Sequence, residues 1–285
     1  MLYRLLSVVA LVASMANPLA RLARAEQSLS LNPFAAAARG APSVLALDMP
    51  ADKPTLSLEL PIWTAGLDGN VGVRGFTSRI QESFLDLLDK TDSLIGLELR
   101  PELRYGPWTL YADGLYFKLG IDDISPGPST LKFKQELVLV DAGIYYHVGT
   151  WNVGPPGNPF ALGLDIGPGV RYMHVGLHLD TARGASRSQS QDWADPLAAM
   201  QVTLDLDKHW RILTRADVGG GVCADLTWSA ALIFSYRFAI TSNISASLSF
   251  GYKAVAENYH NGSGNQRFTW DAVMHGPILG AAIEF

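Results

Sequence analysis

The sequence predicts an all-β fold, a closed antiparallel β-barrel of about ten strands, with eight strands as the alternative. Three observations predict it: polar and apolar residues alternate along most of the chain, no helix-length apolar run follows the first 25 residues, and aromatic residues gather near the expected strand ends. Hydrophobic residues nevertheless make up 48% of the 285 residues. Such a chain must bury its hydrophobic side chains in a core or present them to lipid in alternation.

The first 25 residues predict a secretory signal peptide. Arg4 precedes an apolar run from Leu5 to Ala13, and the candidate cleavage sites, which consist of small residues, end at Ala16 or Ala25. This run is too short to span a bilayer as a helix, and we expect cleavage after Ala25. The protein is therefore expected to be exported.

Charge and cysteine content exclude two classes of protein. The whole chain has a formal net charge of -5, and removal of residues 1–25 takes away three arginines and no acid, which leaves about -8. An acidic chain with no basic cluster is a poor nucleic-acid binder. The single Cys223 cannot form an internal disulfide, so a disulfide scaffold is excluded as well.

After the signal peptide we expect a poorly ordered leader at 26–60, which is rich in Ala, Pro, Ser and Asp, and a barrel at 61–285. Alternation recurs in ten segments, and closed bacterial barrels have an even number of strands. The segments are 61–74, 94–105, 108–119, 134–150, 160–178, 196–206, 210–219, 225–238, 244–256 and 267–285.

The connections between these segments alternate in length. Tight ones are expected at 106–107, 207–209 and 239–243, one of moderate length at 151–159, and longer polar ones at 75–93, 120–133, 179–195 and 257–266. Only the Gly-rich connection near Gly220 breaks this rule by being short. The first long loop contains SFLDLLDK (83–90), which could form one or two helical turns. Short periplasmic turns, long extracellular loops and both termini in the periplasm are typical of an outer-membrane barrel.

The stretch 93–105 raises the question of which face is inside. Glu98, Arg100, Glu102 and Arg104 alternate with leucines and a tyrosine, and a soluble barrel with an apolar interior would show the same period. Aromatic residues favour the membrane alternative, because they form girdles at the two lipid interfaces. They are Trp63, Tyr105, Trp108, Trp151, Phe160, Trp210, Phe238 and Phe285 near one expected end, and Tyr116, Trp228, Tyr252 and Trp270 near the other.

The C-terminus supports the same choice. Leu279, Ala281, Ile283 and Phe285 share one face of the last segment, and a terminal aromatic residue resembles the assembly signal of bacterial outer-membrane proteins. We therefore predict that the apolar face meets lipid and that the charged face lines the lumen.

The predicted lumen is nearly balanced in charge, which indicates ion pairs filling a narrow interior rather than a selective pore. Its acids are Asp68, Glu98, Glu102, Asp113, Asp141, Asp165, Asp205, Asp217 and Glu284, and its bases are Arg74, Arg100, Arg104, Arg171, Arg211, Arg215, Arg237 and Lys253.

Several short motifs resemble those of a family of uncharacterised proteobacterial outer-membrane β-barrel proteins, similar in general architecture to small barrels of the OmpA and OmpW type. The motifs are AGLDGNVGVRG (65–75), SFLDLLDKTD (83–92), WADP (193–196), RADVGGGVCADLTW (215–228), SYRF (235–238), FGYK (250–253) and HGPILG (275–280). The chain departs from the family pattern at GGGVCAD, where the Gly-rich turn is shorter, and at Lys253, which replaces an arginine. The resemblance implies a barrel and supplies no substrate.

The sequence predicts neither a metal or cofactor site nor an enzyme. On a strand, His174 and His178 would lie about 13 Å apart, too far to chelate one ion. DVGGG (217–221) leads into a strand, whereas a phosphate-binding loop leads into a helix. A lipase-like site is not indicated because no His-x-Ser or G-x-S-x-G element is present, and Asp122, Asp123 and His178 match a barrel protease only in residue type.

The expected function is that of a non-enzymatic, structural or surface-exposed protein of the Gram-negative outer membrane. A narrow passive pore for small solutes is the alternative, and a lipid-modifying enzyme or protease is a third class. The expected partners are outer-membrane lipid, lipopolysaccharide and the barrel-assembly machinery, with no nucleic acid.

Overall fold

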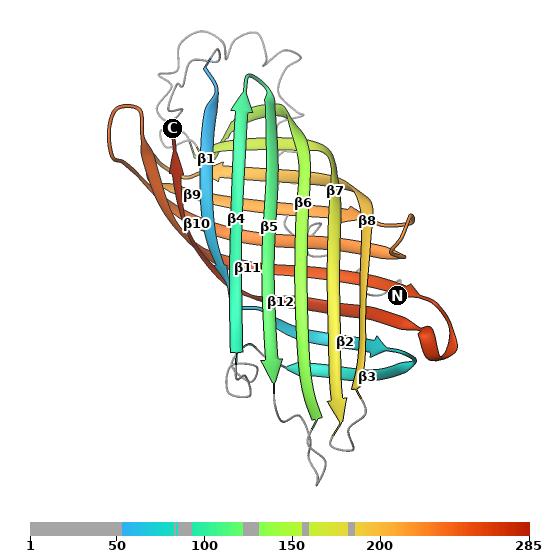
Figure 1. Ribbon diagram of the computed structural model, residues 1–285. Coiled ribbons are helices and arrows are strands. Elements are labelled where there is room, and N and C mark those ends of the chain that lie inside the picture. The colour runs from blue at the N-terminus through green and yellow to red at the C-terminus, as the bar shows by residue number, and fades with distance from the viewer. Residues whose placement is uncertain (1–52, 83, 85–92, 122–130, 156–159, 182–185) are drawn as a thin grey trace. The chain divides into compact units, whose positions relative to one another are not determined.

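A computed structural model describes residues 53–82, 84, 93–121, 131–155, 160–181 and 186–285 (Figure 1). Several expected features lie outside these residues: the signal peptide, the leader up to residue 52, the segment 83–90 apart from Phe84, and both Asp122 and Asp123. Among the described residues, no helix has the length and apolar character needed to cross a membrane.

The described residues form strands and one short 3-10 helix, Gly264–Gln266. The strands are β1 (Thr55–Trp63), β2 (Gly66–Val73), β3 (Phe76–Glu82), β4 (Ser93–Tyr105), β5 (Trp108–Ile121), β6 (Leu131–Val153), β7 (Phe160–Thr181), β8 (Ser186–Asp205), β9 (Trp210–Gly219), β10 (Leu226–Ala239), β11 (Ser245–Asn261) and β12 (Phe268–Glu284).

Ten of these strands close into an antiparallel barrel, which confirms the predicted fold class and strand number. The order is β1-β4-β5-β6-β7-β8-β9-β10-β11-β12, and β1 pairs with β12 to close the ring. The closing register runs from Ser57 opposite Glu284 to Trp63 opposite Ile278. The backbones of Leu56 and Phe285 exchange hydrogen bonds beside it, at 3.2 and 2.9 Å.

The first predicted strand, 61–74, is in fact broken at Thr64 and Ala65. β1 begins at Thr55, inside the expected leader, and follows one half of β12, whereas β2 follows the other half, from Gly66 opposite His275 to Gly72 opposite Thr269. β3 pairs with β2 outside the ten-strand ring. The break lies against β12 so closely that a Cβ atom on Gly276 would be 2.0 Å from the Thr64 carbonyl oxygen.

Connection lengths separate the two ends of the barrel. The short β4–β5, β8–β9 and β10–β11 turns lie at the end where Leu56 meets Phe285, and we call this the short-turn end (Figure 1). β5 ends and β6 begins at the opposite end, which we call the loop end. The β9–β10 connection, Gly220–Asp225, is the short one expected at that end.

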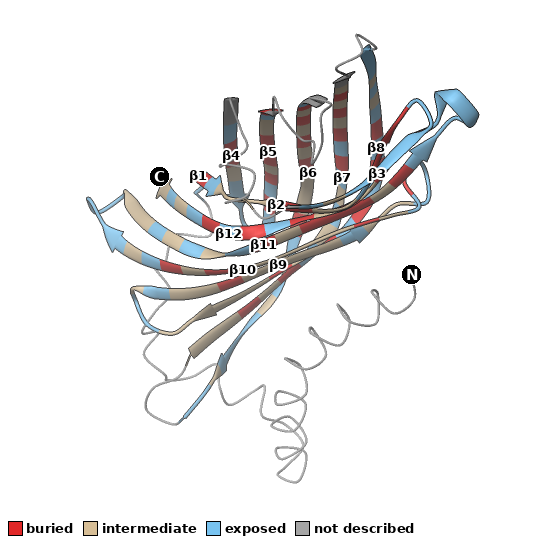
Figure 2. Ribbon diagram, turned by 90° about the horizontal axis from the view of Figure 1, so that it is seen from below, coloured by how far each residue is buried: buried red, intermediate tan, exposed pale blue. Residues whose placement is uncertain are grey.

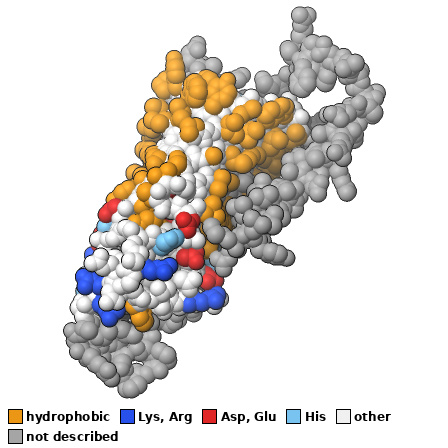
Figure 3. Space-filling model, turned by 90° about the vertical axis from the view of Figure 1, so that its right-hand side faces the viewer, with side chains coloured by type: hydrophobic (Ala, Val, Ile, Leu, Met, Phe, Trp, Pro, Cys, Tyr) orange, Lys and Arg blue, Asp and Glu red, His pale blue; other side chains and the backbone are white. Residues whose placement is uncertain are grey.

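The outward face of the short-turn half is apolar. Burial alternates from residue to residue along β4 to β8 (Figure 2), and apolar side chains gather over the upper half of the face shown in Figure 3. Leu97, for example, is 64% exposed, whereas Glu98 is 3% exposed. Other exposed apolar residues of this band are Leu60, Ile62, Leu99, Leu103, Leu110, Ile166, Val170, Leu248, Phe250 and Leu279. A continuous outward apolar band is what lipid contact requires.

Tyrosines with polar partners mark the edge of this band nearer the loop end. The Tyr172 hydroxyl lies 2.6 Å from Oδ1 of Asp192, which also lies 2.8 Å from Nδ1 of His174. The Tyr252 hydroxyl lies 2.6 Å from Nδ1 of His275. Tyrosine prefers the interface between lipid and water because its ring is apolar and its hydroxyl is polar. Two predicted girdle residues are placed differently, since Trp270 is fully buried inside the barrel and Trp63 packs against the interior apolar residues.

The barrel interior has two layers with different chemistry. The layer nearer the loop end is an apolar cluster that includes Leu137, Leu139, Met173, Val175, Trp193, Phe268 and Trp270. The layer nearer the short-turn end contains most of the buried charged side chains. Each long strand therefore changes its inward chemistry along its length, as β7 does between Arg171 and Met173, which are both almost fully buried.

Candidate functional site: the charged layer of the barrel interior

The first part of the charged layer is a chain of ion pairs across β11, β4 and β5. Lys253 Nζ lies 2.5 Å from Glu98 Oε1 and 3.4 Å from Asp113 Oδ2. Arg100 contacts the same Asp113 oxygen through Nη1 at 3.2 Å and Glu102 Oε1 through Nε at 2.8 Å. Strand alternation places these side chains on one face, and the closure of the barrel brings β11 opposite β4 and β5.

Arg215 of β9 extends this chain across the barrel. Its Nη2 lies 3.2 Å from Glu59 Oε2 and 3.3 Å from Glu102 Oε1, and its Nε donates to Gln201 Oε1 at 3.2 Å. Residues from β1, β4, β8 and β9 thus meet at one guanidinium group. A planar guanidinium suits this position because its donors point in several fixed directions.

Arg171 of β7 organises the second part of the layer. It forms a two-pronged pair with Asp141, with Nε–Oδ1 and Nη2–Oδ2 both at 2.7 Å, and its Nη2 lies 3.0 Å from Asp217 Oδ1. Its Nη1 donates to Thr227 Oγ1 at 2.7 Å, and the hydroxyl of Ser229 donates to Asp217. Two carboxylates therefore share one buried arginine, and local hydroxyl groups complete the hydrogen bonding.

Two stacked tyrosines lie beside this network. The rings of Tyr111 and Tyr145 are 4.4 Å apart at an angle of 18°, and the Arg100 guanidinium lies 4.9 Å from the Tyr111 ring centroid. Glycines make room for them, because a Cβ atom on Gly143 or Gly169 would lie 2.7 Å from the Tyr111 hydroxyl oxygen. The rings fill space that water would otherwise occupy.

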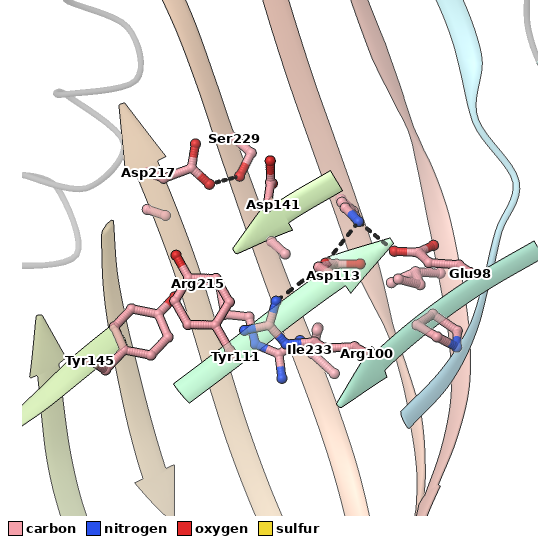
Figure 4. A pocket seen from close by; sticks show the side chains of 15 residues that line it. Glu98, Arg100, Tyr111, Asp113, Asp141, Tyr145, Arg215, Asp217, Ser229 and Ile233 are labelled. Carbon is pink, nitrogen blue, oxygen red and sulfur yellow. Dashed lines mark hydrogen bonds and ion pairs between the residues drawn. The ribbon is translucent and has the colours of Figure 1, made fainter. Parts of the chain in front are cut away.

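A small cavity of about 30 Å³ lies between the ion pairs (Figure 4). Its lining includes Glu98, Arg100 and Asp113, and each has one buried atom without a hydrogen-bond partner among the described residues: Oε2, Nη2 and Oδ1 respectively. This volume suits one or two waters, which would accept from the arginine and donate to the carboxylates. It is far too small to act as an open channel.

Further polar groups lie toward the short-turn end. Arg211 forms a two-pronged pair with Asp205 at 2.6 and 2.9 Å, and Arg237 Nη2 lies 2.9 Å from the same carboxylate. Nδ1 of His147 lies 2.7 Å from Asp165 Oδ1, and Nε2 of His147 lies 2.9 Å from the Thr150 hydroxyl. The imidazole thus joins a carboxylate on one side and a hydroxyl on the other.

The structure places most of the predicted lumen residues inside the barrel and joins them in pairs. These residues are Glu98, Arg100, Glu102, Asp113, Asp141, Asp165, Arg171, Asp205, Arg211, Arg215, Asp217, Arg237 and Lys253. Arg104 is exposed at the short-turn end, where its Nε donates to the Thr109 hydroxyl at 3.4 Å. Leu279 and Phe285 of the C-terminal motif point outward and are exposed.

Asp68 and Arg74 are corrections, because neither lies in the lumen. The Asp68 side chain is 41% exposed and pairs at 3.9 Å with Arg79, whereas the neighbouring Leu67, Val71 and Val73 are buried. Arg74 is exposed in the β2–β3 turn and contacts the carbonyl of Ser188. The prediction failed because β2 lies near the loop end, where the interior is apolar and the polar face points outward.

Sequence reasoning missed three acids of the interior, of which Asp195 and Glu257 are buried and Glu59 is half-buried. Glu59 was assigned to the leader. Asp195 is 1% exposed and accepts hydrogen bonds from the backbone N–H groups of residues 222–224, which it holds in the β9–β10 turn. Glu257 accepts a 2.7 Å hydrogen bond from Nε1 of Trp193. Asp195 and Glu257 follow the alternation of their strands, so a strict period of two extended to the loop end could have found them.

Comparisons with known proteins assign no sequence family, since no family model and no curated protein matches the chain. Solved structures with a similar arrangement include a FadL homologue of Pseudomonas aeruginosa, at 10% identity over 82% of this chain and 90% of that chain, with a TM-score of 0.25. The CymD monoaromatic hydrocarbon channel has 9% identity over 82% and 88% of the two chains and a TM-score of 0.22. The Pseudomonas putida toluene transporter TodX has 9% identity over 82% and 89%, with a TM-score of 0.21. TM-scores this low carry no argument about the function of this chain.

Proposed function

We propose that this protein is an integral outer-membrane β-barrel with a sealed interior, and that its role is structural or surface-exposed. The observation that carries the proposal is the filling of the interior by two successive layers, one of ion pairs around Arg100, Arg171 and Arg215 and one of apolar side chains around Trp193 and Trp270. This role requires no catalysis and no cofactor.

Membrane insertion is supported by the outward apolar band and by the tyrosines at its edge. In the proposed orientation the short-turn end faces the periplasm, and the loop end faces outward, where polar outward residues such as Asp192 and His174 would meet the headgroups of lipopolysaccharide. The barrel-assembly machinery would recognise the C-terminal motif, which consists of Leu279, Ala281, Ile283 and Phe285.

The rival function is a narrow passive pore. It would require a continuous water-filled path, whereas the cavity in the charged layer has only about 30 Å³ and the apolar layer lies between it and the loop end. Buried ion pairs with both signs of charge also differ from a selective filter, which presents an excess of one sign.

The deciding experiment is planar-bilayer conductance of the refolded protein. Folding is checked first by gel migration, because a closed barrel resists unfolding in detergent until it is heated. We expect little or no steady conductance from folded protein. A large and steady single-channel conductance would replace the sealed barrel with the pore.

A further inference from the structure

Three residues at the short-turn end of the interior form a hydroxyl–imidazole–carboxylate series. Thr150 Oγ1 lies 2.9 Å from Nε2 of His147, and Nδ1 of His147 lies 2.7 Å from Oδ1 of Asp165. One tautomer satisfies both contacts: with its proton on Nδ1, the imidazole donates to Asp165 and accepts from the Thr150 hydroxyl. A nucleophile, a general base and an orienting acid have this arrangement in hydrolytic triads.

A β-bulge in β6 creates this geometry. Residues three apart on a regular strand point to opposite faces, so His147 and Thr150 should not meet. The register instead passes from His147 opposite Asp165 to Gly149 opposite Leu164, which inserts one residue, Val148. His147 and Thr150 consequently share the inward face. Bulges are over-represented beside active sites, where they redirect a side chain.

Solvent access increases along the series in the order that catalysis requires. The Asp165 side chain is buried, and its second oxygen accepts from Gln201 Nε2 at 3.4 Å. The His147 side chain is 39% exposed, and Thr150 is exposed. Thr150 faces Gly163 on β7, where the missing side chain makes room for Thr203 Oγ1 from β8.

We propose that Thr150, His147 and Asp165 form a hydrolytic site for small, water-soluble carboxylic esters that enter at the short-turn end. This activity goes beyond the proposed sealed barrel and does not depend on whether the barrel conducts. The substrate is small because His147 and Thr203 already occupy the space beside Gly163, opposite Thr150, and leave little room for an acyl chain. No sequence motif predicts the site, since its acid comes from a different strand and the bulge sets its spacing.

The reaction has two balanced steps. The Thr150 oxygen attacks the ester carbonyl while His147 Nε2 takes the hydroxyl proton, and that proton passes to the departing alcohol as the ester C–O bond breaks. A water molecule then attacks the acyl-threonine, His147 takes a proton from the water, and the proton returns to Thr150 as the carboxylic acid leaves. Asp165 remains a carboxylate and stabilises the imidazolium.

The test uses refolded full-length barrel with two probes, p-nitrophenyl acetate and a fluorophosphonate. We expect wild-type protein to hydrolyse the ester and to be labelled at Thr150, as located by peptide mass spectrometry. Thr150→Ala and His147→Gln should lower the rate about 100-fold or more, which is the usual size of general acid–base and nucleophilic contributions. Thr150→Ser should raise labelling, because a primary hydroxyl is less hindered.

Thr214→Ala is the matched control, because Thr214 is a threonine of β9 outside the series; its rate and labelling should equal those of wild type. Gel migration confirms that each variant is folded. Ester hydrolysis no faster than in the Thr150→Ala variant, or fluorophosphonate attached to a residue other than Thr150, would overturn the proposal.

Discussion

Arg171 on β7 and Asp141 on β6 form a two-pronged ion pair inside the barrel, with both N–O distances at 2.7 Å. The arginine side chain is 1% exposed. Asp217 contacts the same guanidinium from β9, so one cation on β7 compensates two carboxylates, one from β6 and one from β9. The relationship shows why the charged layer is a unit: removal of one member leaves others buried without a partner.

Arg171→Ala should therefore lower the free energy of unfolding by about 3–5 kcal/mol, the range for a broken buried ion pair. Arg171→Lys should lower the free energy of unfolding less than Arg171→Ala does, because the ammonium group keeps the charge but loses the two-pronged geometry. Urea unfolding in detergent, followed by tryptophan fluorescence, measures both. Arg79→Ala is the control, because its pair with Asp68 is exposed and long, and it should change stability by less than about 1 kcal/mol. Equal effects at the two positions would contradict this account of the network.

The two interior layers should seal the barrel independently. Arg100→Ala removes the link between Asp113 and Glu102, and Trp193→Ala removes a ring that stacks on Tyr259 at 4.0 Å and donates to Glu257. Each single variant should lose stability yet remain nearly closed in planar-bilayer recordings, because the other layer stays in place. The double variant should conduct. Arg104→Ala serves as the control, since Arg104 is exposed and its loss should leave stability and conductance close to wild type. High conductance of the Trp193→Ala protein alone would show that the charged layer is no barrier.

Deletion of Phe285 should reduce assembly far more than deletion of residues 30–50. The Phe285 backbone exchanges two hydrogen bonds with Leu56 where β1 and β12 close the ring, and its side chain is exposed on the outward face. Phe285→Ala keeps the backbone bonds and removes the ring, so it separates closure from recognition by the assembly machinery. Yields of folded protein in isolated outer membranes measure all three. Equal yields from the two deletions would argue against a role for the C-terminal residue.

The β8–β9 turn should respond to acid through Asp207. This carboxylate accepts hydrogen bonds from the backbone N–H groups of Trp210 at 2.7 Å and His209 at 2.6 Å, which hold its pKa below the usual aspartate value. Because the folded pKa lies below the unfolded one, the stabilisation is present above the unfolded pKa and is lost as pH falls through the folded pKa. Wild type should thus resist urea better than Asp207→Ala at neutral pH, and the difference should disappear in strong acid. A difference that is constant across this pH range would show that the charge has no role.

The sequence by itself determined most of the strands and their alternation, although β3 lies in an expected loop and β1 begins in the expected leader. The spacing of Glu98, Arg100, Glu102 and Arg104 predicts a strand with one charged face, and the lengths of the connections predict two unlike ends. These features could be predicted because side-chain period and turn composition are local properties of a chain. The same reasoning assigned Asp141, Arg171 and Arg215 to the lumen, and the structure places these three residues in the charged layer.

Only the tertiary structure decided whether polar or apolar side chains point into the barrel at each height. Near the short-turn end Arg171 points in and Val170 points out, whereas nearer the loop end Met173 points in and His174 lies on the outward face with Asp192. Both alternatives suggested by the alternation are therefore present in one barrel, and assigning a single polarity to the whole chain misplaced Asp68 and Arg74. The physical reason is that side chains alternate with the same period whether the outward face meets lipid or water. Only the position of a strand segment relative to the apolar band decides whether its outward side chains are apolar or polar. The break at Thr64 and the bulge at Val148 depend in the same way on neighbouring strands far away in the sequence.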